Sequence, residues 1–282
     1  MTWPTESSIT TGDGLQLRTF RWLPKEAPRA LVFIVHGYGE HSGRYAWAAE
    51  QLVSRGYAAF AIDHRSHGKS GGEPRAYIDS IPQVVADLKQ FVDQVSAEFP
   101  HIRRFMLGHS MGGLIAWSYT VRHQDTLSGL ISSGAAIDAD ANVSPAVAAI
   151  GELLAKIAPK MPFLDLAPMA ELAANPDVAP AFEADPLTYK GKMRIGIGIA
   201  ISHEARYIKK RLGEVMIPVL ILHGELDKIV NPSGSKRAFE AVGSAQRTHL
   251  VYEGMRHEIL NERERDIVMS DILGFINGLA EK

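Results

Sequence analysis

The residues of this chain best suited to chemistry form the segment Gly108-His109-Ser110-Met111-Gly112. An apolar run over 103–107 precedes it and predicts a strand, whereas 111–122 predicts a helix. A serine on a tight strand-to-helix turn has its hydroxyl held above the edge of the sheet, and flanking glycines let the two backbones approach closely. Because five such letters also arise by chance, the flanking strand and helix carry the inference. Ser110 is therefore a candidate nucleophile.

Two later loops supply the acid and the base that such a serine needs. A hydroxyl is a weak nucleophile at neutral pH until a neighbouring imidazole accepts its proton and an acid holds that imidazole. In a sheet protein with this serine motif, the acid and then the histidine follow in the chain, each at the carboxyl end of a strand. Asp227 follows the predicted strand 218–222, and His257 follows the predicted strand 248–252. Ser110, Asp227 and His257 are the predicted catalytic residues.

Alternatives exist for both partners of the serine. Glu225 lies in the same loop as Asp227 but nearer the end of the strand, so Asp227 is preferred as the acid. Of the eleven histidines, only His249 and His257 come late enough to be the base. His249 falls inside a strand pattern, which favours a structural role, whereas His257 lies in a loop.

An acyl-transfer site also needs two backbone N–H groups that point at the developing oxyanion. Met111, directly after the candidate nucleophile, would supply one of them. The loop after the apolar run 30–35 begins His36-Gly37-Tyr38, and its glycines allow a turn in which the N–H of Tyr38 points inward. The alternative is a plain turn at the end of a strand. Glu40 and Arg44 follow this loop and would contact the polar head of a substrate or support the loop, with support preferred.

Three other motifs favour structural roles. His64 and His67, near Asp63, have a spacing found in zinc sites, but no third ligand follows at an obvious spacing, so we expect hydrogen bonding instead. Gly196-Ile197-Gly198 lacks the third glycine of a dinucleotide-binding loop. The run Lys209-Lys210-Arg211 reads as a solvated face, with attraction to an anionic membrane surface as the alternative.

Strand and helix alternate along most of the chain, which is typical of a doubly wound α/β sheet. Several apolar runs without alternation predict parallel strands covered on both faces. Gly12-Asp13-Gly14 suits a hairpin turn, and Ser80 and Gln83 have the spacing of a capping box at the start of a helix. The predicted strands are 6–11, 15–23, 30–35, 57–62, 103–107, 127–132, 218–222 and 248–252, and the further predicted helices are 45–55, 111–122 and one that carries Ile267 to Ile276.

The alternation breaks between Ile137 and Met216. Seven of the fifteen prolines fall between Pro145 and Pro186, among short apolar segments such as 146–158. This predicts a mostly helical cap, or lid, inserted after a core strand. The predicted core is 1–137 and 217–282, and the predicted cap is 138–216. We expect the apolar helix of the cap to pack within it, and contact with lipid is the alternative.

Composition narrows the class of protein further. With 282 residues, 46% of them hydrophobic and 22% charged, the chain suits one large globular α/β domain with an insertion. The net charge of −2 argues against nucleic acid as the main partner. The chain has no cysteine, which excludes disulfides, thiolate metal sites and a cysteine nucleophile. With no secretory signal and no long apolar run in the sequence, we expect a cytoplasmic protein.

The sequence resembles the branch of the α/β-hydrolase superfamily that contains monoacylglycerol lipases and lysophospholipases. The resemblance covers nearly the whole chain. It implies a mostly parallel eight-stranded sheet with helices on both faces, a helical cap over an apolar acyl tunnel, and neither cofactor nor metal. It also implies Ser110, Asp227 and His257 as the triad, with Tyr38 and Met111 as oxyanion donors. The segments that carry it are 36–45 (HGYGEHSGRY), 63–70 (DHRSHGKS), 108–113 (GHSMGG), and His223-Gly224 ahead of Asp227.

One residue departs from the family pattern: Ser66 stands where the family usually has glycine. If this position needs a positive φ, the serine costs on the order of 1 kcal/mol. The departure concerns the geometry of that loop and leaves the triad unaffected.

From these observations we expect a carboxylic ester hydrolase that releases glycerol and a fatty acid from monoacylglycerols. The first alternative is a lysophospholipase or a broad esterase of small substrates. The second is a ligand-binding receptor of the same fold that hydrolyses slowly. The expected partner is a small lipid ester, with peripheral membrane contact through the cap left open. The sequence does not determine the oligomeric state.

Overall fold

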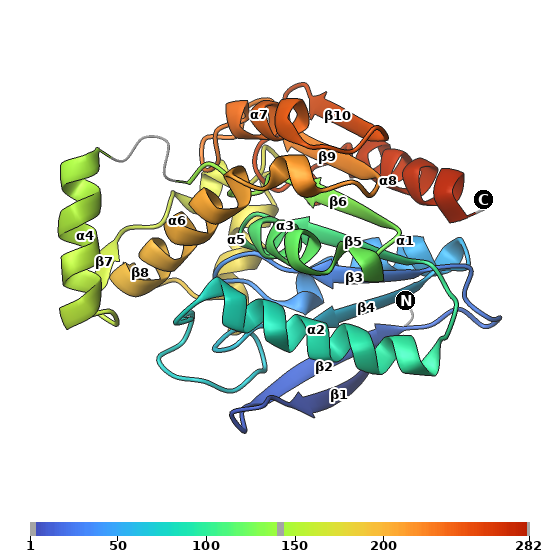
Figure 1. The fold of residues 1–282 in the computed structure, drawn as a ribbon, viewed down its shortest axis with the longest axis horizontal. Helices are drawn as coiled ribbons and strands as arrows, with labels where there is room; N and C mark the ends of the chain where they lie inside the picture. Colours follow the sequence, from blue (N-terminus) through green and yellow to red (C-terminus); the bar gives the residue numbers. More distant parts are fainter. Residues whose placement is uncertain (1–3, 140–143, 281–282) are drawn as a thin grey trace.

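An eight-stranded sheet forms the centre of the protein in a computed structural model that describes residues 4–139 and 144–280 (Figure 1). The strand order is β1-β2-β4-β3-β5-β6-β9-β10. The β1–β2 and β2–β4 pairs are antiparallel and the other pairs are parallel, as the resemblance implied. The strands are β1 (Thr5–Thr10), β2 (Gln16–Trp22), β3 (Leu31–Val35), β4 (Ala58–Ile62), β5 (Arg104–His109), β6 (Gly129–Ser133), β9 (Val219–Gly224) and β10 (Arg247–Tyr252).

Helices cover both faces of this sheet because its central strands are apolar on both faces. In β3, Leu31, Phe33 and Val35 belong to one hydrophobic core, whereas Val32 and Ile34 belong to the other. Helices α2, α3 and α6 close the first core, and α1 and α8 close the second. The α-helices are α1 (Ala46–Ser54), α2 (Ile81–Glu98), α3 (Met111–His123), α4 (Pro145–Ile157), α5 (Val178–Ala184), α6 (Ile195–Lys209), α7 (Ser233–Ala241) and α8 (Arg265–Ala280).

Between β6 and β9 the chain leaves the sheet and forms a mostly helical segment. Helix α6 packs against α2 and α3 on one side and against α4 on the other, and in Figure 1 α4 stands apart from the sheet at the left. The division into a core and a 138–216 cap stays a prediction, and residues 140–143 of that cap lie outside the described part of the chain. The segment also contains the strands β7 (Pro162–Leu164) and β8 (Met193–Arg194) and the short 3-10 helix η3 (Met169–Glu171).

The predicted elements agree closely with the observed ones. Each predicted strand is present, with its ends within two residues of the predicted positions. The Ser80 hydroxyl accepts a hydrogen bond from the N–H of Gln83, as the capping-box spacing indicated. Helix α7 was not predicted, because its nine-residue sequence is mostly polar and Ala238 is its only fully buried apolar side chain. Among the described helices, none combines the length and the apolar character needed to cross a bilayer.

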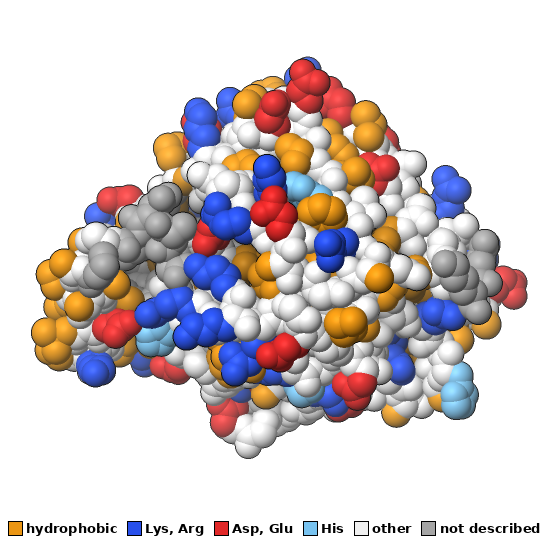
Figure 2. Space-filling view, turned by 45° about the horizontal axis from the view of Figure 1, so that its top comes forward, with side chains coloured by type: hydrophobic (Ala, Val, Ile, Leu, Met, Phe, Trp, Pro, Cys, Tyr) orange, Lys and Arg blue, Asp and Glu red, His pale blue; other side chains and the backbone are white. Residues whose placement is uncertain are grey.

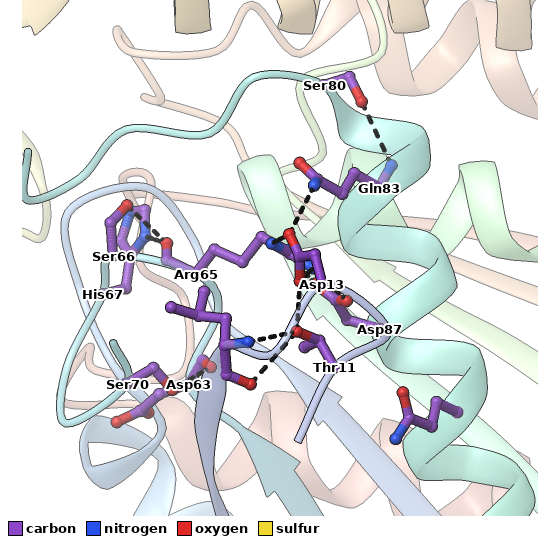
Figure 3. Close-up of polar contacts among 12 residues, drawn as sticks. Thr11, Asp13, Asp63, Arg65, Ser66, His67, Ser70, Ser80, Gln83 and Asp87 are labelled. Atoms are coloured by element: carbon purple, nitrogen blue, oxygen red, sulfur yellow. Dashed lines mark hydrogen bonds and ion pairs between the residues drawn. The ribbon is translucent and has the colours of Figure 1, made fainter. Parts of the chain in front are cut away.

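The loop that follows β4 is held by polar contacts rather than by apolar packing (Figure 3). Arg65 binds Asp87 on α2 and makes two hydrogen bonds, of 2.6 and 2.9 Å, to Asp13 in the β1–β2 turn. Asp63 accepts hydrogen bonds from the N–H groups of Ser42 and Lys69, each at 2.8 Å. Through Ser42, this loop supports the loop that follows β3.

Ser66, where the family pattern has glycine, lies in the left-handed region with a φ of 59°. Its hydroxyl oxygen accepts a hydrogen bond from the N–H of Tyr77 at 2.8 Å and also contacts the carbonyl of Tyr77. Ser66 therefore has the positive φ that the sequence analysis considered for this position, together with hydrogen bonds that a glycine would lack.

Candidate active site

Ser110 lies on a strained turn between β5 and α3. Its φ of 56° and ψ of −121° are unusual for a residue with a side chain, and such strain is typical of functional turns. Two glycines make the turn possible. A Cβ atom on Gly112 would lie 2.1 Å from the carbonyl oxygen of Val35, and one on Gly108 would lie 2.4 Å from that of Gly112. These glycines therefore allow α3 to pack directly on β3 and β5.

His257 and Asp227 are hydrogen-bonded to each other. Their Nδ1 and Oδ2 atoms are 2.7 Å apart, and both side chains are almost completely buried. The other carboxylate oxygen of Asp227 accepts hydrogen bonds from the N–H groups of Ile229 (2.8 Å) and Val230 (2.9 Å). Burial alone would raise the pKa of Asp227, but hydrogen bonds from His223 and His257 hold it well below its ordinary value. Asp227 is thus a carboxylate at neutral pH.

The two alternative residues have other contacts. Glu225 is exposed, and its carboxylate accepts a hydrogen bond from the N–H of Gly254 at 3.1 Å. His249 lies on β10, with its Nε2 2.9 Å from the hydroxyl of Ser235 on α7. Neither residue lines the cavity described next.

One cavity of about 1290 Å³ is lined by five of the candidate residues, and Asp227 and Arg44 are not among its lining residues. Ser110 and His257 line it from the core, with Gly37, Tyr38 and Glu40 beside them. Most of its remaining wall is apolar and comes from the segment between β6 and β9, and residues 228–237, which follow β9, complete it. The apolar side chains of that wall include Val147, Ile150, Leu154, Phe163, Leu164 and Ile199.

The two backbone groups predicted for the oxyanion site also line this cavity. Within the described part of the chain, the N–H groups of Tyr38 and Met111 donate to no other atom. The Tyr38 loop is fixed on both sides. Before it, the N–H of Gly37 donates to Glu40 at 2.5 Å, and after it, Gly39 (φ +72°) accepts a hydrogen bond from the N–H of Tyr189 at 2.7 Å. Tyr189 belongs to the segment between β6 and β9.

Glu40 and Arg44 form a buried network that joins the Tyr38 loop to the His257 loop. Glu40 accepts hydrogen bonds from the N–H of Gly37 and, at 2.7 Å, from the hydroxyl of Tyr45. Arg44 donates to Glu40 at 2.7 Å and to both carboxylate oxygens of Glu258 at 2.7 Å each. Both residues therefore have contacts that support the loop, as the sequence analysis preferred.

The charges in this network stabilise one another. Burial would raise the pKa of Glu40, but the positive charge of Arg44, together with His109, holds it below its ordinary value. Burial would lower the pKa of Arg44, but Glu258 and Glu40 raise it above its ordinary value. Arg44 also lies over the ring of Phe182 on α5, 4.9 Å from its centre. A single guanidinium therefore contacts two loops of the site and the segment that covers it.

Three residues near the site received no role in the sequence analysis, although the motifs it names contain two of them, His109 and His223. The ring of His109 lies 4.6 Å from that of His257, and burial with the nearby His257 lowers the pKa of His109 to about 4. Glu258 binds Arg44, and His223 binds Asp227. His109 directly precedes Ser110, Glu258 directly follows His257, and His223 is the last residue but one of β9, the strand before Asp227. Their closeness in the sequence to a predicted site residue is the signal that could have identified them.

The other motifs for which the sequence analysis favoured structural roles make hydrogen bonds within the protein, or lie within a helix. His64 donates its N–H to Nε2 of His36 at 3.0 Å, and Nδ1 of His67 lies 2.8 Å from the carbonyl of Arg65. Burial lowers the pKa of His67 to about 4. Gly196-Ile197-Gly198 lies in the first turn of α6, and Lys209, at the end of α6, binds Asp138 at 3.0 Å.

Comparisons with known proteins agree with this architecture. The model of a family described as "Serine aminopeptidase, S33" matches residues 26–264. The chain is 34% identical over 271 residues to a monoacylglycerol lipase of Mycolicibacterium smegmatis, covering 96% of each chain. It is 28% identical over 260 residues to the phospholipase YtpA of Bacillus subtilis, covering 89% of this chain and 96% of the relative. A crystal structure of Paleococcus ferrophilus monoacylglycerol lipase superposes with a TM-score of 0.83 at 27% identity, covering 94% and 98% of the two chains.

The family match covers most of the chain, and the strand order and the turn at Ser110 are those expected of an α/β hydrolase. The chain belongs to the serine aminopeptidase S33 family of serine hydrolases, with the α/β-hydrolase fold.

Proposed function

We propose that this serine hydrolase cleaves monoacylglycerols into glycerol and a fatty acid, with Ser110, His257 and Asp227 as its catalytic residues. The observation that carries the proposal is one apolar cavity lined by both the strained Ser110 and the Asp227-bound His257. The monoacylglycerol lipases among the relatives support the choice of substrate.

The geometry supports a two-step reaction through an acyl-enzyme. His257 Nε2 accepts the proton of the Ser110 hydroxyl, whose oxygen bonds to the ester carbonyl carbon. The negative charge that forms on the carbonyl oxygen is stabilised by the N–H groups of Tyr38 and Met111. The bond to glycerol then breaks, and glycerol leaves with the proton from His257. In the second step water attacks the acyl group in the same way, so that the fatty acid leaves and Ser110 regains its proton.

The shape of the cavity suits a substrate with one long apolar chain. Ligand cavities for small molecules are commonly about 300–1,000 Å³, and this one is larger, at about 1290 Å³. Its apolar wall comes from the segment between β6 and β9, so we assign residues 138–216 as a cap on a core of 1–137 and 217–282. The polar groups near Ser110 would face the glycerol head, and the apolar wall would face the acyl chain.

We further propose that the cap contacts membranes peripherally. Apolar side chains gather at the end of the molecule where α4 lies, at the left of Figure 2. A contiguous patch of exposed apolar side chains commonly marks a binding site. The proposal also suits substrates that reside in lipid. The cytoplasmic location stays a prediction. The exposed apolar residues are Val147, Ile150, Leu153, Ile157, Met161, Phe163 and Leu164.

A substrate panel tests the proposed activity. We expect turnover of 1- and 2-monoacylglycerols to exceed that of lysophosphatidylcholine of the same chain length. Ser110→Ala should abolish it, whereas Ser54→Ala, which changes an exposed serine on α1, should not. Faster turnover of lysophosphatidylcholine would instead favour a lysophospholipase, which the phospholipase relative makes the second candidate. Stoichiometric ligand binding with negligible turnover of every ester would favour a receptor.

Flotation on liposomes tests the membrane contact. The variant Ile150→Ser with Ile157→Ser removes two exposed apolar side chains of α4, and we expect it to bind vesicles more weakly than the unaltered protein. Ile267→Ser is the matched control, because this isoleucine is similarly exposed (57%, against 59% for Ile150) on α8 of the core. Equal flotation of all three proteins would refute the contact.

A further inference from the structure

We propose that His223 is a positioning residue for the active site: it holds one carboxylate oxygen of Asp227 and thereby sets how strongly that oxygen stabilises protonated His257. This inference rests on the proposed catalytic roles of Asp227 and His257. It concerns the last residue but one of β9, whose side chain is completely buried.

The contacts of His223 fix the position of its proton. Its Nε2 lies 3.0 Å from Oδ2 of Asp227 and 3.0 Å from the carbonyl oxygen of Val230. A carboxylate oxygen and a carbonyl oxygen can only accept hydrogen bonds, so Nε2 must carry a hydrogen that it donates. His223 therefore acts as a donor toward the acid of the site.

Two imidazoles share one oxygen of that acid. Oδ2 of Asp227 is 2.7 Å from Nδ1 of His257 and 3.0 Å from Nε2 of His223. The other oxygen, Oδ1, accepts the two N–H groups of Ile229 and Val230. A change in the hydrogen bond from His223 thus acts on Oδ2 of Asp227, the atom that stabilises His257 while His257 holds the proton of Ser110.

Filling space does not explain a histidine at this position. Nδ1 of His223 is buried and has no hydrogen-bond partner among the described residues. A buried polar atom without a partner is unfavourable, and a leucine of similar size would avoid that cost. The bond from Nε2 to Asp227 is the contact that offsets it.

Loss of this bond has a predictable direction. With one donor fewer, Oδ2 carries more negative charge toward His257 and stabilises the imidazolium more strongly. The acidic limb of the pH profile of kcat/KM would move upward.

Other charged and titratable groups around these side chains set the background. The ring of His109 on β5 contacts that of His257. Burial, with His257 nearby, lowers the pKa of His109 to about 4, so His109 stays neutral through an acidic limb of kcat/KM that lies at higher pH. On β10, burial lowers the pKa of His249, and His223 lowers it further. Further charged groups near this region are Arg44, which binds both Glu40 and Glu258, Lys228, which lines the cavity with His257, and Lys236 on α7, which acts on His249.

A matched pair of variants isolates the donor. His223→Leu fills a similar space without a hydrogen-bond donor, whereas His223→Gln keeps an N–H near the position of Nε2. Because Oδ2 of Asp227 loses a contact that holds it in position, we expect the leucine variant to lower kcat roughly tenfold, with KM little changed. We expect the acidic limb of kcat/KM to move up by about half a pH unit or more. The glutamine variant should recover most of kcat and the original limb. His249→Gln, on the neighbouring strand, is the control for removal of a nearby histidine.

Nitrogen NMR of the unaltered protein tests the same inference without any variant. With ¹⁵N-labelled histidine, we expect His223 to carry its proton on Nε2. A proton on Nδ1 alone would overturn the inference, as would leucine and glutamine variants that fold and share the original acidic limb. If the unaltered protein hydrolyses no ester, the proposed function fails, and the position of the His223 proton still tests the contact on its own.

Discussion

Replacement of Arg44 by methionine tests the buried network that joins the two loops of the site. Methionine has a similar length but neither charge nor donors, so Arg44→Met removes one hydrogen bond to Glu40 and two to Glu258, all at 2.7 Å. The three side chains are only 11%, 4% and 5% exposed, so water cannot replace the lost contacts. Removal of one partner from a buried ion pair costs about 3–5 kcal/mol. We expect a loss of that size in the free energy of unfolding at pH 8.

The loss should depend on pH, and its sign follows from Glu40. In the unaltered protein the pKa of Glu40 is lowered, so its contribution to stability is present above the unfolded pKa and disappears as pH falls through the folded pKa. Without Arg44, burial dominates and the pKa of Glu40 should lie above its unfolded value. The native variant then binds more protons than the unfolded chain, so it becomes relatively more stable as pH falls. The difference between the two proteins should therefore narrow from pH 8 to pH 5, by up to about 1.4 kcal/mol per pH unit for one proton.

Urea unfolding at the two pH values measures both quantities. Arg21→Met is the matched control, because Arg21 also binds a glutamate, Glu98, through two hydrogen bonds, but with side chains that are 25% and 45% exposed. A surface pair of this kind contributes about 0–1 kcal/mol. The reasoning is refuted if Arg44→Met costs no more than Arg21→Met at pH 8, or if its cost stays constant or grows on acidification.

Four further substitutions test the backbone around the site, each by urea or thermal unfolding together with esterase activity. Gly112→Ala should destroy the packing of α3 on β3, since its Cβ would lie 2.1 Å from a carbonyl oxygen, and soluble, active Gly112→Ala enzyme would contradict this. Gly274→Ala, at an exposed position of α8 with nothing within 4 Å, should instead raise the free energy of unfolding by about 0.5–1 kcal/mol. Ser110→Gly should relieve the strain of a φ of 56° and gain about 1 kcal/mol while activity is lost, and an unchanged stability would argue against stored strain. Ser66→Gly relieves a similar φ of 59°, but it loses buried hydrogen bonds whose removal costs about 1–3 kcal/mol, so we expect it to be destabilising. A gain in stability would show that those hydrogen bonds contribute less than the strain costs.

Much of the fold follows from short patterns in the sequence. The apolar runs of β3, β4, β6 and β9 predict buried parallel strands because a strand covered on both faces has no polar side. The glycines around Ser110 predict a tight turn because a side chain at either position would collide with a neighbouring backbone. Helix α7 was not predicted, since its sequence is short and contains few apolar residues.

The contacts around the site depend on tertiary structure and were only partly predictable. The order of Ser110, Asp227 and His257 in the chain narrowed the choice of acid and base. One of the two carboxylates that Arg44 binds, by contrast, belongs to Glu258, 214 residues away, and no local pattern connects the two. In the same way, the sequence placed His223 near the edge of the sheet but gave no sign that its ring binds Asp227.

The central claim is that Ser110 is the nucleophile of this hydrolase, activated by His257. Treatment with a serine-reactive fluorophosphonate, followed by peptide mass mapping and an activity assay on the same sample, tests it most directly. We expect one equivalent of label, located at Ser110, with ester hydrolysis lost in proportion to labelling and with labelling much slower in His257→Ala. Label at another serine, or full hydrolysis after complete modification of Ser110, would contradict the claim.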